Sequence, residues 1–363
     1  MAKVVLSNLR KEFGKTVAVE GLSIEVPDGG FISILGPSGC GKTTTLNMIA
    51  GLLPPTTGDI YIGEKRVTDL TPKEREVGLV FQDYAVFPTM TGYENIAFGL
   101  KLKKMPDHEI DREVKRIADL LDITDVMHKN PRSMNQSELQ RVAVGRTLVT
   151  KPAILLLDEP LSNLDAAFRA RMRAELKRLC LDFHQTVIYV THDQIEAMSL
   201  SNKIAVMSMG RLQQLASPED IYHKPLNRFV AGFIGSPPMN FVDCTYEEHD
   251  GKAYLNQGTF KLDITKFKDL IQSQATGSEL VLGARPEDIH VHEKAAGKQA
   301  IEATVYAFEP QGSESIVDLQ LGKSIVRALV SGFIPLEPGE KRFVEFDLNK
   351  VHILDKKTEK AII

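Results

Sequence analysis

The chain has 363 residues, 43% of them hydrophobic and 25% charged, and its formal net charge at pH 7 is −4. This length exceeds one ordinary domain and the composition is that of a soluble globular protein, so we expect two or three domains. The slightly acidic charge gives no electrostatic basis for binding nucleic acid, and no apolar run approaches the about 20 residues needed to cross a bilayer.

Cysteine usage and the N-terminus both indicate a cytosolic protein. The sequence holds three cysteines, too few for a disulfide framework. The first residues, MAKVVLSNLRKEF, are charged and lack the apolar core of a signal peptide. We therefore expect a reducing compartment, and a membrane role only through a partner.

The first predicted elements are two strands, Val4 to Leu9 and Leu22 to Val26, separated by a loop that contains Phe13. An aromatic residue shortly before a phosphate-binding segment can stack on a nucleotide base. A single phenylalanine is more often part of the protein's own packing. On the residues alone, packing is the favoured interpretation.

The most specific motif follows an apolar run, Phe31 to Leu35, that predicts a buried strand. It matches G-x-x-x-x-G-K-[ST] at every required place and reads Gly36-Pro37-Ser38-Gly39-Cys40-Gly41-Lys42-Thr43. Three glycines let successive N–H groups point inward around a phosphate. Lys42 can reach the β- and γ-phosphates, and the Thr43 hydroxyl suits Mg²⁺. The helix-forming stretch that continues from Thr44 argues against a chance match, so this segment predicts a site for a nucleoside triphosphate.

The segment from about residue 88 to 150 is predicted to be a helical insertion in an α/β core. It follows an apolar run, Val77 to Phe81, that ends at Gln82. Few strand signals occur in it. A helix is expected to open at Asp107 as the N-cap, and a second helix to run from about Ser137 through Leu148.

An acidic pair, Asp158-Glu159, comes directly after the apolar run Ala153 to Leu157. Two carboxylates at the end of a buried strand are costly unless positive charge lies opposite, and Mg²⁺ beside a triphosphate supplies it. Asp158 therefore fits a magnesium ligand, and Glu159 fits the base that deprotonates the attacking water. The alternative is an ordinary strand end that breaks into solvent, which the phosphate-binding motif disfavours.

A further strand is predicted over Thr186 to Val190 and ends at Thr191-His192-Asp193. A lone histidine at a strand end is usually structural. In α/β proteins, however, ligands lie at the carboxyl edge of the sheet. His192 is therefore a candidate contact of the γ-phosphate.

The pattern of predicted secondary structure changes after Gly235-Ser236-Pro237-Pro238. Downstream, short strand-like runs alternate with turn signals: Ile301 to Val305, Ile316 to Leu321, Ile325 to Val330 and Phe343 to Leu348. We expect a nucleotide-binding domain over residues 1–235 and a small all-β domain, folded as a barrel and without catalytic residues, over 236–363.

The ordered set of the phosphate loop, Gln82, LLLDEPLSNLDA and THD resembles the ATP-binding subunits of ATP-binding-cassette (ABC) transporters. The stretches SPEDIYHKPLNRFVAGFIGSPPMNF and GARPEDI look like those of bacterial sugar and glycerol-phosphate importer ATPases of the maltose-importer type. The resemblance implies an α/β P-loop core with a helical insertion. It also implies that the C-terminal all-β, TOBE-type domain is similar to paired oligonucleotide-fold-like domains, which serve regulation and dimer contact rather than chemistry.

The same resemblance implies roles for individual residues. Phe13 occupies the position of the aromatic residue that stacks on adenine, and Gln82 that of the glutamine that senses Mg²⁺. Asp165 matches the aspartate that crosses the dimer, and His192 the switch histidine. Tyr84 to Pro88 lies where the family receives a short helix of the membrane subunit.

One family element is altered. The signature LSGGQ should fall at residues 134–138, where this chain has MNQSE. In the family, the signature serine and glycine N–H groups at a helix N-terminus touch the γ-phosphate of ATP held by the other chain. Gln136 and Ser137 add side chains there, and Glu138 adds a negative charge, a repulsion of about 1 kcal/mol at roughly 4 Å in water. Because Asn135 can still cap the helix and donate an N–H, Asn135 and Ser137 remain candidate nucleotide contacts, and we expect impairment rather than necessarily loss.

Three functions follow as hypotheses. The leading one is the ATP- and Mg²⁺-dependent ATPase of an importer for a sugar, polyol or glycerol-type solute. It would lie peripherally on the cytoplasmic face of the inner membrane, with membrane permeases, a solute-binding protein and a second, possibly non-identical ATPase chain. The alternative is an ATP-binding scaffold with weak hydrolysis. An ABC protein of nucleic acid metabolism ranks low, because zinc-binding cysteine pairs, a tandem cassette and a basic tail are missing from the sequence.

Overall fold

The computed structural model describes residues 2–81, 83–162, 164–182, 184–295, 299–332 and 335–363. It divides into two compact units, Met1–Pro218 and Glu219–Ile363. The predicted domain boundary at 235/236 lies inside the second unit. It stays a prediction, because a compact unit and a domain need not have the same bounds. Among the described residues, no helix is both long and apolar enough to cross a membrane.

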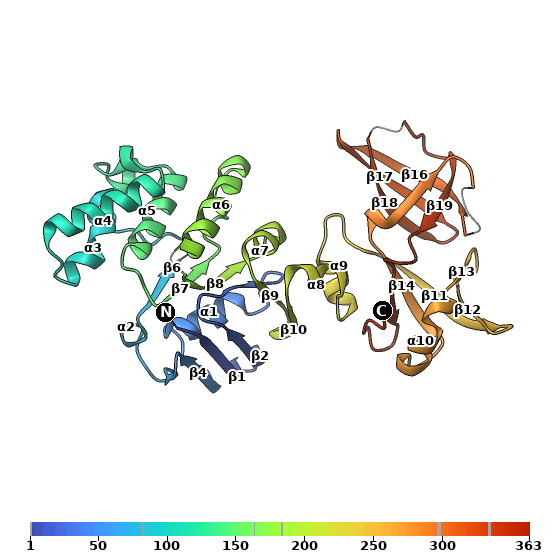
Figure 1. The fold of residues 1–363 in the computed structure, drawn as a ribbon, viewed down its shortest axis with the longest axis horizontal. Helices are drawn as coiled ribbons and strands as arrows, with labels where there is room; N and C mark the ends of the chain where they lie inside the picture. The colour runs from blue at the N-terminus through green and yellow to red at the C-terminus, as the bar shows by residue number, and fades with distance from the viewer. Residues whose placement is uncertain (1, 82, 163, 183, 296–298, 333–334) are drawn as a thin grey trace. The chain divides into compact units, whose positions relative to one another are not determined.

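The first unit contains two β-sheets (Figure 1). The smaller sheet is antiparallel with the order β2-β1-β4-β5 and consists of β1 (Val4–Phe13), β2 (Thr16–Val26), β4 (Thr57–Ile62) and β5 (Lys65–Arg66). The larger sheet has the order β10-β9-β3-β8-β7-β6 and consists of β3 (Phe31–Leu35), β6 (Val77–Val80), β7 (Ile154–Asp158), β8 (Thr186–Thr191), β9 (Lys203–Ser208) and β10 (Arg211–Ala216). Its strands pair in parallel except for β10, which runs antiparallel to β9.

The N-terminal strands are longer than predicted. β1 runs to Phe13 and β2 begins at Thr16, so Phe13 ends a strand instead of lying in the predicted loop. The pairing of β1 with β2 shifts register at three places. Such bulges interrupt the alternation of apolar and polar residues on which a strand prediction depends, which is why only the outer ends of this hairpin were predicted.

Both faces of the larger sheet are buried, because successive residues of its strands enter different cores. In β7, Leu155 and Leu157 pack with the helices α3 to α6, whereas Ile154 and Leu156 pack with α1 and the antiparallel sheet. The continuous apolar sequence of this strand is the expected consequence. The strand ends at Asp158, which therefore lies at one edge of the sheet.

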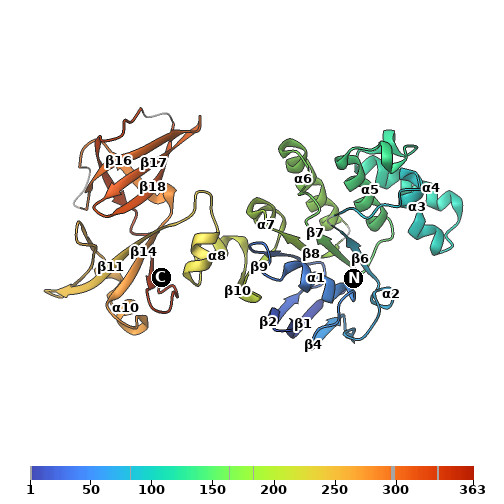
Figure 2. The same ribbon diagram turned by 180° about the vertical axis from the view of Figure 1, so that it is seen from behind.

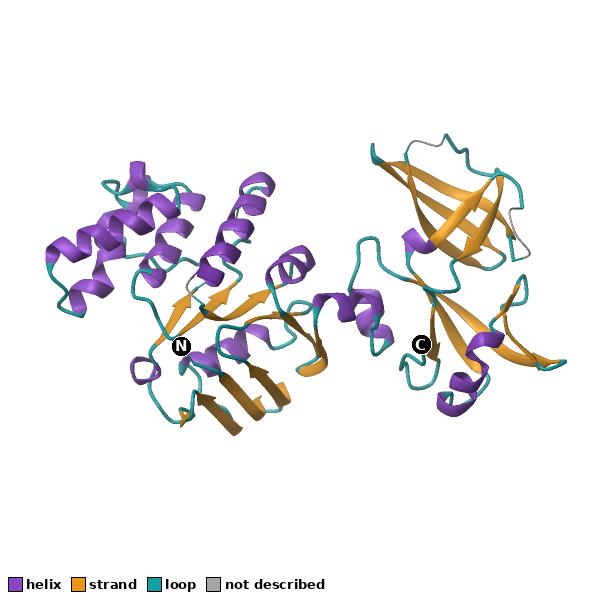
Figure 3. Ribbon diagram, viewed as in Figure 1, coloured by secondary structure: helices purple, strands orange, loops and turns teal. Residues whose placement is uncertain are grey.

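The predicted helical insertion is confirmed and forms a group of helices at one end of the first unit (Figures 2 and 3). The helices of this unit are α1 (Lys42–Ala50), α2 (Pro72–Arg75), α3 (Gly92–Leu102), α4 (Asp107–Leu120), α5 (Gln136–Leu148), α6 (Ala166–Asp182) and α7 (Gln194–Leu200). The predicted N-cap of α4 is wrong by one residue. Pro106 occupies the N-cap and Asp107 the first turn, where its charge favours the positive end of the helix dipole.

The second unit is mostly β-structure, as predicted. α8 (Pro218–His223) begins at the unit boundary, and α9 (Arg228–Phe233) and α10 (Lys268–Gln274) are short. One sheet has the order β13-β12-β11-β14-β20, with β11 (Asn240–His249), β12 (Lys252–Asn256), β13 (Lys261–Asp263), β14 (Glu279–Ala284) and β20 (His352–Asp355). The other has the order β15-β19-β16-β17-β18, with β15 (Ile289–His292), β16 (Ile301–Pro310), β17 (Glu314–Leu321), β18 (Ser324–Ser331) and β19 (Lys341–Phe346). These two five-stranded sheets share one hydrophobic core. The residues alone predicted one barrel, whereas the family resemblance implied paired oligonucleotide-fold-like domains.

Candidate active site

The candidate site lies where three neighbouring parallel strands of the larger sheet end. Leu35 of β3 is in register with Thr191 of β8, and Val190 of β8 with Asp158 of β7. The phosphate-loop motif follows β3, His192 follows β8, and Asp158 ends β7 with Glu159 directly after it. Residues far apart in the sequence therefore meet at one edge, as the sequence predicted.

The phosphate-loop segment needs glycine at two places where the backbone passes close to another strand. A Cβ atom added to Gly36 would lie 2.2 Å from the carbonyl oxygen of Met207, and one added to Gly41 would lie 2.5 Å from the carbonyl oxygen of Ala18. Gly41 also has a φ of 104°, in the left-handed region. The loop therefore passes so close to β2 and β9 that neither position has room for a Cβ atom.

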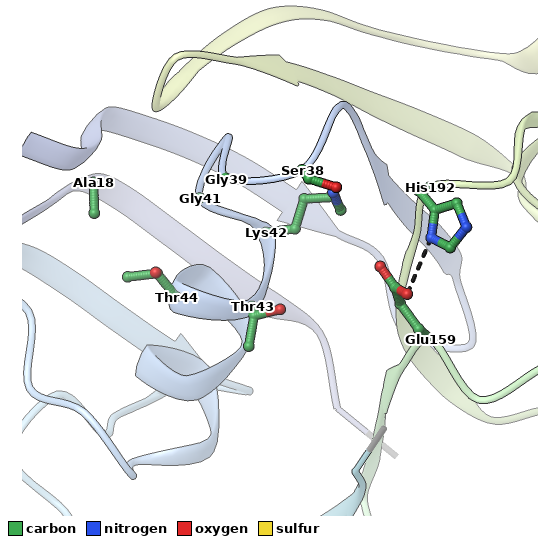
Figure 4. Close-up of a pocket in the computed structure, with 9 residues that line it drawn as sticks. All are labelled: Ala18, Ser38, Gly39, Gly41, Lys42, Thr43, Thr44, Glu159 and His192. Atoms are coloured by element: carbon green, nitrogen blue, oxygen red, sulfur yellow. Dashed lines mark ion pairs between the residues drawn. The ribbon is translucent and has the colours of Figure 1, made fainter. Parts of the chain in front are cut away.

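The loop opens onto a cavity of about 390 Å³ (Figure 4). Its lining consists of Ala18, Ser38, Gly39, Gly41, Lys42, Thr43, Thr44, Glu159 and His192. The Lys42 ammonium donates to the carbonyl oxygens of Gly36 at 2.8 Å and Pro37 at 3.1 Å. A buried cation and the N-terminal end of α1 thus face a cavity that is suited to a phosphate chain.

Thr43 and Asp158 bring two hard oxygen ligands together. The Thr43 hydroxyl donates to a carboxylate oxygen of Asp158 at 3.3 Å. Burial raises the pKa of Asp158, and the charge of Glu159 adds to this, while Thr43 and Lys42 oppose it. A divalent cation would relieve this destabilised carboxylate, and hydroxyl and carboxylate oxygens are ligands that Mg²⁺ prefers.

Glu159 and His192 contact each other in the wall of the cavity (Figure 4), and the contact is an ion pair when the imidazole is protonated. The His192 Nδ1 atom lies 3.0 Å from a Glu159 carboxylate oxygen. The Glu159 backbone has a φ of 46°, a conformation that costs a non-glycine residue of order 1–3 kcal/mol. Its N–H donates to the carbonyl oxygen of Val190 at 2.9 Å. The strained backbone is thus tied to β8, and the carboxylate is directed to the cavity.

The residues next to His192 in the sequence belong to a hydrogen-bond network that was not predicted. The buried Glu196 carboxylate accepts from the hydroxyls of Tyr189 at 2.8 Å and Thr191 at 2.7 Å. Asp193 caps α7 by accepting from the N–H groups of Ile195 and Glu196. Burial raises the pKa of Glu196, although both hydroxyls oppose it. The residues on both sides of His192 are therefore fixed, which restricts where its imidazole can lie.

The other predicted contacts of the first unit have different surroundings. Phe13 ends β1, is 50% exposed and has the Lys11 ammonium 5.2 Å from its ring centre, but it is not among the residues that line the cavity. Cys40 is buried inside the loop, and burial raises the pKa of its thiol. The exposed Asp165 carboxylate accepts from the N–H of Phe168 and so caps α6. Gln82 lies outside the described residues.

Glu138, whose negative charge was predicted to repel a triphosphate, has partners within its own chain, and the repulsion stays a prediction. Glu138 and Asn135 form a capping box at the start of α5: the Asn135 side chain accepts from the Glu138 N–H at 2.9 Å, and the Glu138 carboxylate accepts from the Asn135 N–H at 2.8 Å. The other Glu138 oxygen lies 3.0 Å from the Lys129 ammonium. Burial works to raise the pKa of Glu138, but the Asn135 N–H and Lys129 outweigh it and the pKa is lowered. The negative charge is therefore balanced within the chain.

The segment Tyr84 to Pro88 is attached to the helical insertion. The Asn95 side chain bonds both the N–H and the carbonyl oxygen of Phe87, at 2.8 and 3.1 Å. Arg146 of α5 donates to the carbonyl oxygen of Ala85 at 2.7 Å, and its guanidinium lies 4.9 Å from the centre of the Phe87 ring. A movement of this segment is therefore coupled directly to α3 and α5.

Known proteins are similar to the chain over its whole length. The family described as ABC transporter matches residues 19–162, the MalK OB fold domain residues 235–289 and the TOBE domain residues 282–354. The Trehalose/maltose import ATP-binding protein MalK of Thermococcus litoralis is 48% identical, and the Oligosaccharides import ATP-binding protein MsmX of Bacillus subtilis is 41% identical, each over 100% of both chains.

Solved structures agree with this assignment. A dimeric, post-hydrolysis structure of an ATP-binding cassette bound to ADP and phosphate is 29% identical, with a TM-score of 0.56, and covers 59% of this chain and 98% of its own. The cavity, its phosphate loop and its carboxylates thus lie in the part of the chain that has the fold of such cassettes. The chain belongs to the ABC transporter family, as an ATP-binding subunit with the C-terminal domains of the MalK type.

Proposed function

We propose that the chain is the ATP-hydrolysing subunit of an importer for a sugar, polyol or glycerol-type solute. The observation that carries the proposal is the convergence of Lys42, the Thr43–Asp158 pair and the Glu159–His192 pair on one cavity. The class of solute rests on the relatives, whose names specify import of trehalose, maltose and oligosaccharides.

The residues around the cavity would have different roles in binding and hydrolysing ATP. The N–H groups of residues 36–44 and the Lys42 ammonium would hold the phosphates, and Phe13 would stack on the adenine ring. Thr43 and Asp158, with Gln82, would hold Mg²⁺, which offsets the charge of the phosphates and of the carboxylates. The Glu159 carboxylate would accept a proton from the attacking water, and its ion pair with His192 would keep the accepting oxygen in place.

The site is completed by a second chain in this proposal. Asp165 and the N-terminal end of α5, with Asn135 and Ser137, would face the nucleotide bound by that chain. Because MNQSE replaces LSGGQ here, we infer that the second chain is a different ATPase with an intact signature. The ATP bound in the cavity of this chain would then be the one that is hydrolysed.

The membrane subunits are the remaining partners. Tyr84 to Pro88 and the helical insertion would receive them, and the chain would lie on the cytoplasmic face of the inner membrane. A solute-binding protein on the other side of the membrane would deliver the solute. The contacts of Asn95 and Arg146 support this assignment, since they connect the segment to α3 and α5.

An assay of ATP turnover tests the proposal. Turnover is measured for the purified chain alone and together with its partner ATPase. We expect slow turnover alone and much faster turnover in the mixture, whereas vigorous turnover by the chain alone, near that of a relative with LSGGQ, contradicts the heteromeric arrangement.

The altered signature also favours a second candidate, an ATP-binding scaffold. Solute uptake into vesicles with the reconstituted importer distinguishes the two. If the chain is the motor, Glu159→Gln abolishes uptake; if uptake is unchanged, the chain is the scaffold.

A further inference from the structure

Arg169 lies in the first turn of α6 and contacts two segments that flank the candidate active site. One terminal nitrogen of its guanidinium donates to the backbone carbonyl oxygens of Ser162 at 3.4 Å and Leu164 at 3.0 Å, residues that precede the helix. The other terminal nitrogen lies 3.3 Å from a carboxylate oxygen of Asp193, the residue that follows His192. We call these three contacts the Arg169 bridge.

One end of the Arg169 bridge is attached to the backbone of Glu159. The hydroxyl and the N–H of Ser162 both donate to the Glu159 carbonyl oxygen, at 2.9 and 3.3 Å. The N–H of Arg169 donates to the carbonyl oxygen of Asp165 at 2.8 Å, which fixes the start of the side chain in the first turn of α6. Hydrogen bonds therefore lead from Glu159 through Ser162 to the guanidinium.

The other end of the Arg169 bridge is attached to the segment that carries His192. Asp193 caps α7 with one carboxylate oxygen and faces Arg169 with the other, and its N–H donates to the Thr191 hydroxyl at 2.9 Å. His192 lies between these two residues, with its Nδ1 atom 3.0 Å from the Glu159 carboxylate (Figure 4). Glu159 and His192 are thus connected twice, once directly and once through the Arg169 bridge.

The geometry of the Arg169 bridge requires a guanidinium. Its planar fork presents donors in separate directions, whereas a lysine ammonium is a single point charge. The Arg169 and Asp193 side chains are 29% and 21% exposed, so solvent screens their ion pair and limits its contribution to stability. Arg169 is also not among the described residues that line the cavity. Its contacts therefore affect the site through Glu159 and His192 and not through the nucleotide.

We propose that Arg169 is a positioning residue for ATP hydrolysis: the Arg169 bridge keeps Glu159 and His192 at the separation that the attacking water requires. The inference rests on the proposed ATPase function and adds a residue to it. A misplacement of about 1 Å can slow a reaction by about 10²-fold. Asp165, which in the proposed function faces the second chain, directly precedes α6, so contact with that chain would act on the same bridge.

ATP turnover by the chain with its partner ATPase, measured over a range of ATP concentrations, tests the inference. Arg169→Gln should lower kcat by at least about tenfold and leave the KM for ATP within about twofold, because the residue does not line the cavity. Arg169→Lys keeps the charge without the fork and should have an intermediate kcat. Arg178→Gln, at an exposed arginine of the same helix, is the matched control and should behave as the unaltered chain.

A second substitution breaks the bridge from its other end. Asp193→Asn removes the negative charge, while asparagine remains able to cap α7. We expect it to lower kcat as well. Arg169→Gln should then have a smaller effect in the Asp193→Asn chain than in the unaltered chain, because the contact between the two side chains is already lost. Thermal unfolding of each variant establishes that folded proteins are compared.

Unchanged kcat in Arg169→Gln would overturn the inference, and a lower unfolding temperature alone would then assign Arg169 a purely structural role. Strictly additive effects of Arg169→Gln and Asp193→Asn on kcat would overturn it too. Should Arg169→Gln fail to fold, Asp193→Asn decides, and an unchanged kcat in that variant is the contrary result.

Failure of the proposed function has a different signature in the same assay. In that case the unaltered chain with its partner hydrolyses no ATP, or Glu159→Gln turns over at the unaltered rate. If Glu159→Gln is inactive and the Arg169 and Asp193 variants are fully active, the proposed function stands and only the role of Arg169 is wrong.

Discussion

At the scale of single residues, the candidate active site is a place where function conflicts with stability. Asp158 is 7% exposed and its pKa is raised by burial and by the neighbouring Glu159. Glu159 itself has a left-handed backbone conformation. Neither feature helps the chain to fold. Both are understandable if the site is built for Mg²⁺ and for a water molecule that loses a proton.

The raised pKa of Asp158 predicts a stabilising substitution. A group whose pKa is higher in the folded than in the unfolded state contributes stability below its unfolded pKa and loses it as the pH rises through the folded value. At pH 7 the Asp158 carboxylate is therefore a cost to folding, and Asp158→Asn should raise the unfolding temperature by about 2–4 °C.

The pH dependence provides the control for that prediction. The gain from Asp158→Asn should shrink as the pH falls toward the ordinary aspartate value of 3.8, because the carboxyl group is then protonated in both states. The measurement is thermal unfolding at pH 7 and at lower pH, without nucleotide or Mg²⁺. A lower unfolding temperature for the variant at pH 7 would contradict this interpretation.

At the scale of elements, α5 shows how an altered motif is accommodated. The capping box of Asn135 and Glu138 satisfies N–H groups at the start of the helix, and Lys129 balances the Glu138 carboxylate. The substitution of MNQSE for LSGGQ therefore preserves the start of the helix. What it changes is the bulk at Gln136 and Ser137, where the family has glycine.

This balance predicts a coupled pair of substitutions. Lys129→Met leaves the mostly buried Glu138 carboxylate without its cation and should lower the free energy of unfolding by about 1 kcal/mol, a modest value because the Lys129 side chain is 34% exposed. Glu138→Gln in the same chain removes the need for the cation and should restore most of the loss. Urea unfolding of the two single variants and the double variant measures the coupling. Additive effects would mean that the pair does not interact.

At the scale of the whole molecule, the first unit could be predicted well because its functional residues follow strands. The motif at residues 36–43 and the pair Asp158-Glu159 each come directly after an apolar run, and parallel strands bring such positions to one edge. Their chemistry is carried by residue type and spacing, which a sequence displays.

Contacts between distant segments could not be predicted in the same way. Ala18 lines the cavity only because β2 passes against Gly41, and no local pattern marks it. The pairing of Lys129 with Glu138 and the network around Glu196 depend on helix and strand packing. In the second unit the strands β11 to β15 and β20 escaped prediction, and with them the arrangement of two sheets around one core.

We propose that Glu159 is the base for ATP hydrolysis in the cavity of this chain. A single-turnover measurement of phosphate release from ATP by the chain with its partner ATPase tests this role directly. It compares Glu159→Gln with Glu64→Gln, a substitution at an exposed glutamate outside the cavity lining. We expect the Glu159 variant to bind ATP as before but to release phosphate at least about 10²-fold more slowly, and the Glu64 variant to behave as the unaltered chain. Phosphate release by the Glu159 variant at the unaltered rate would show that Glu159 is not the base.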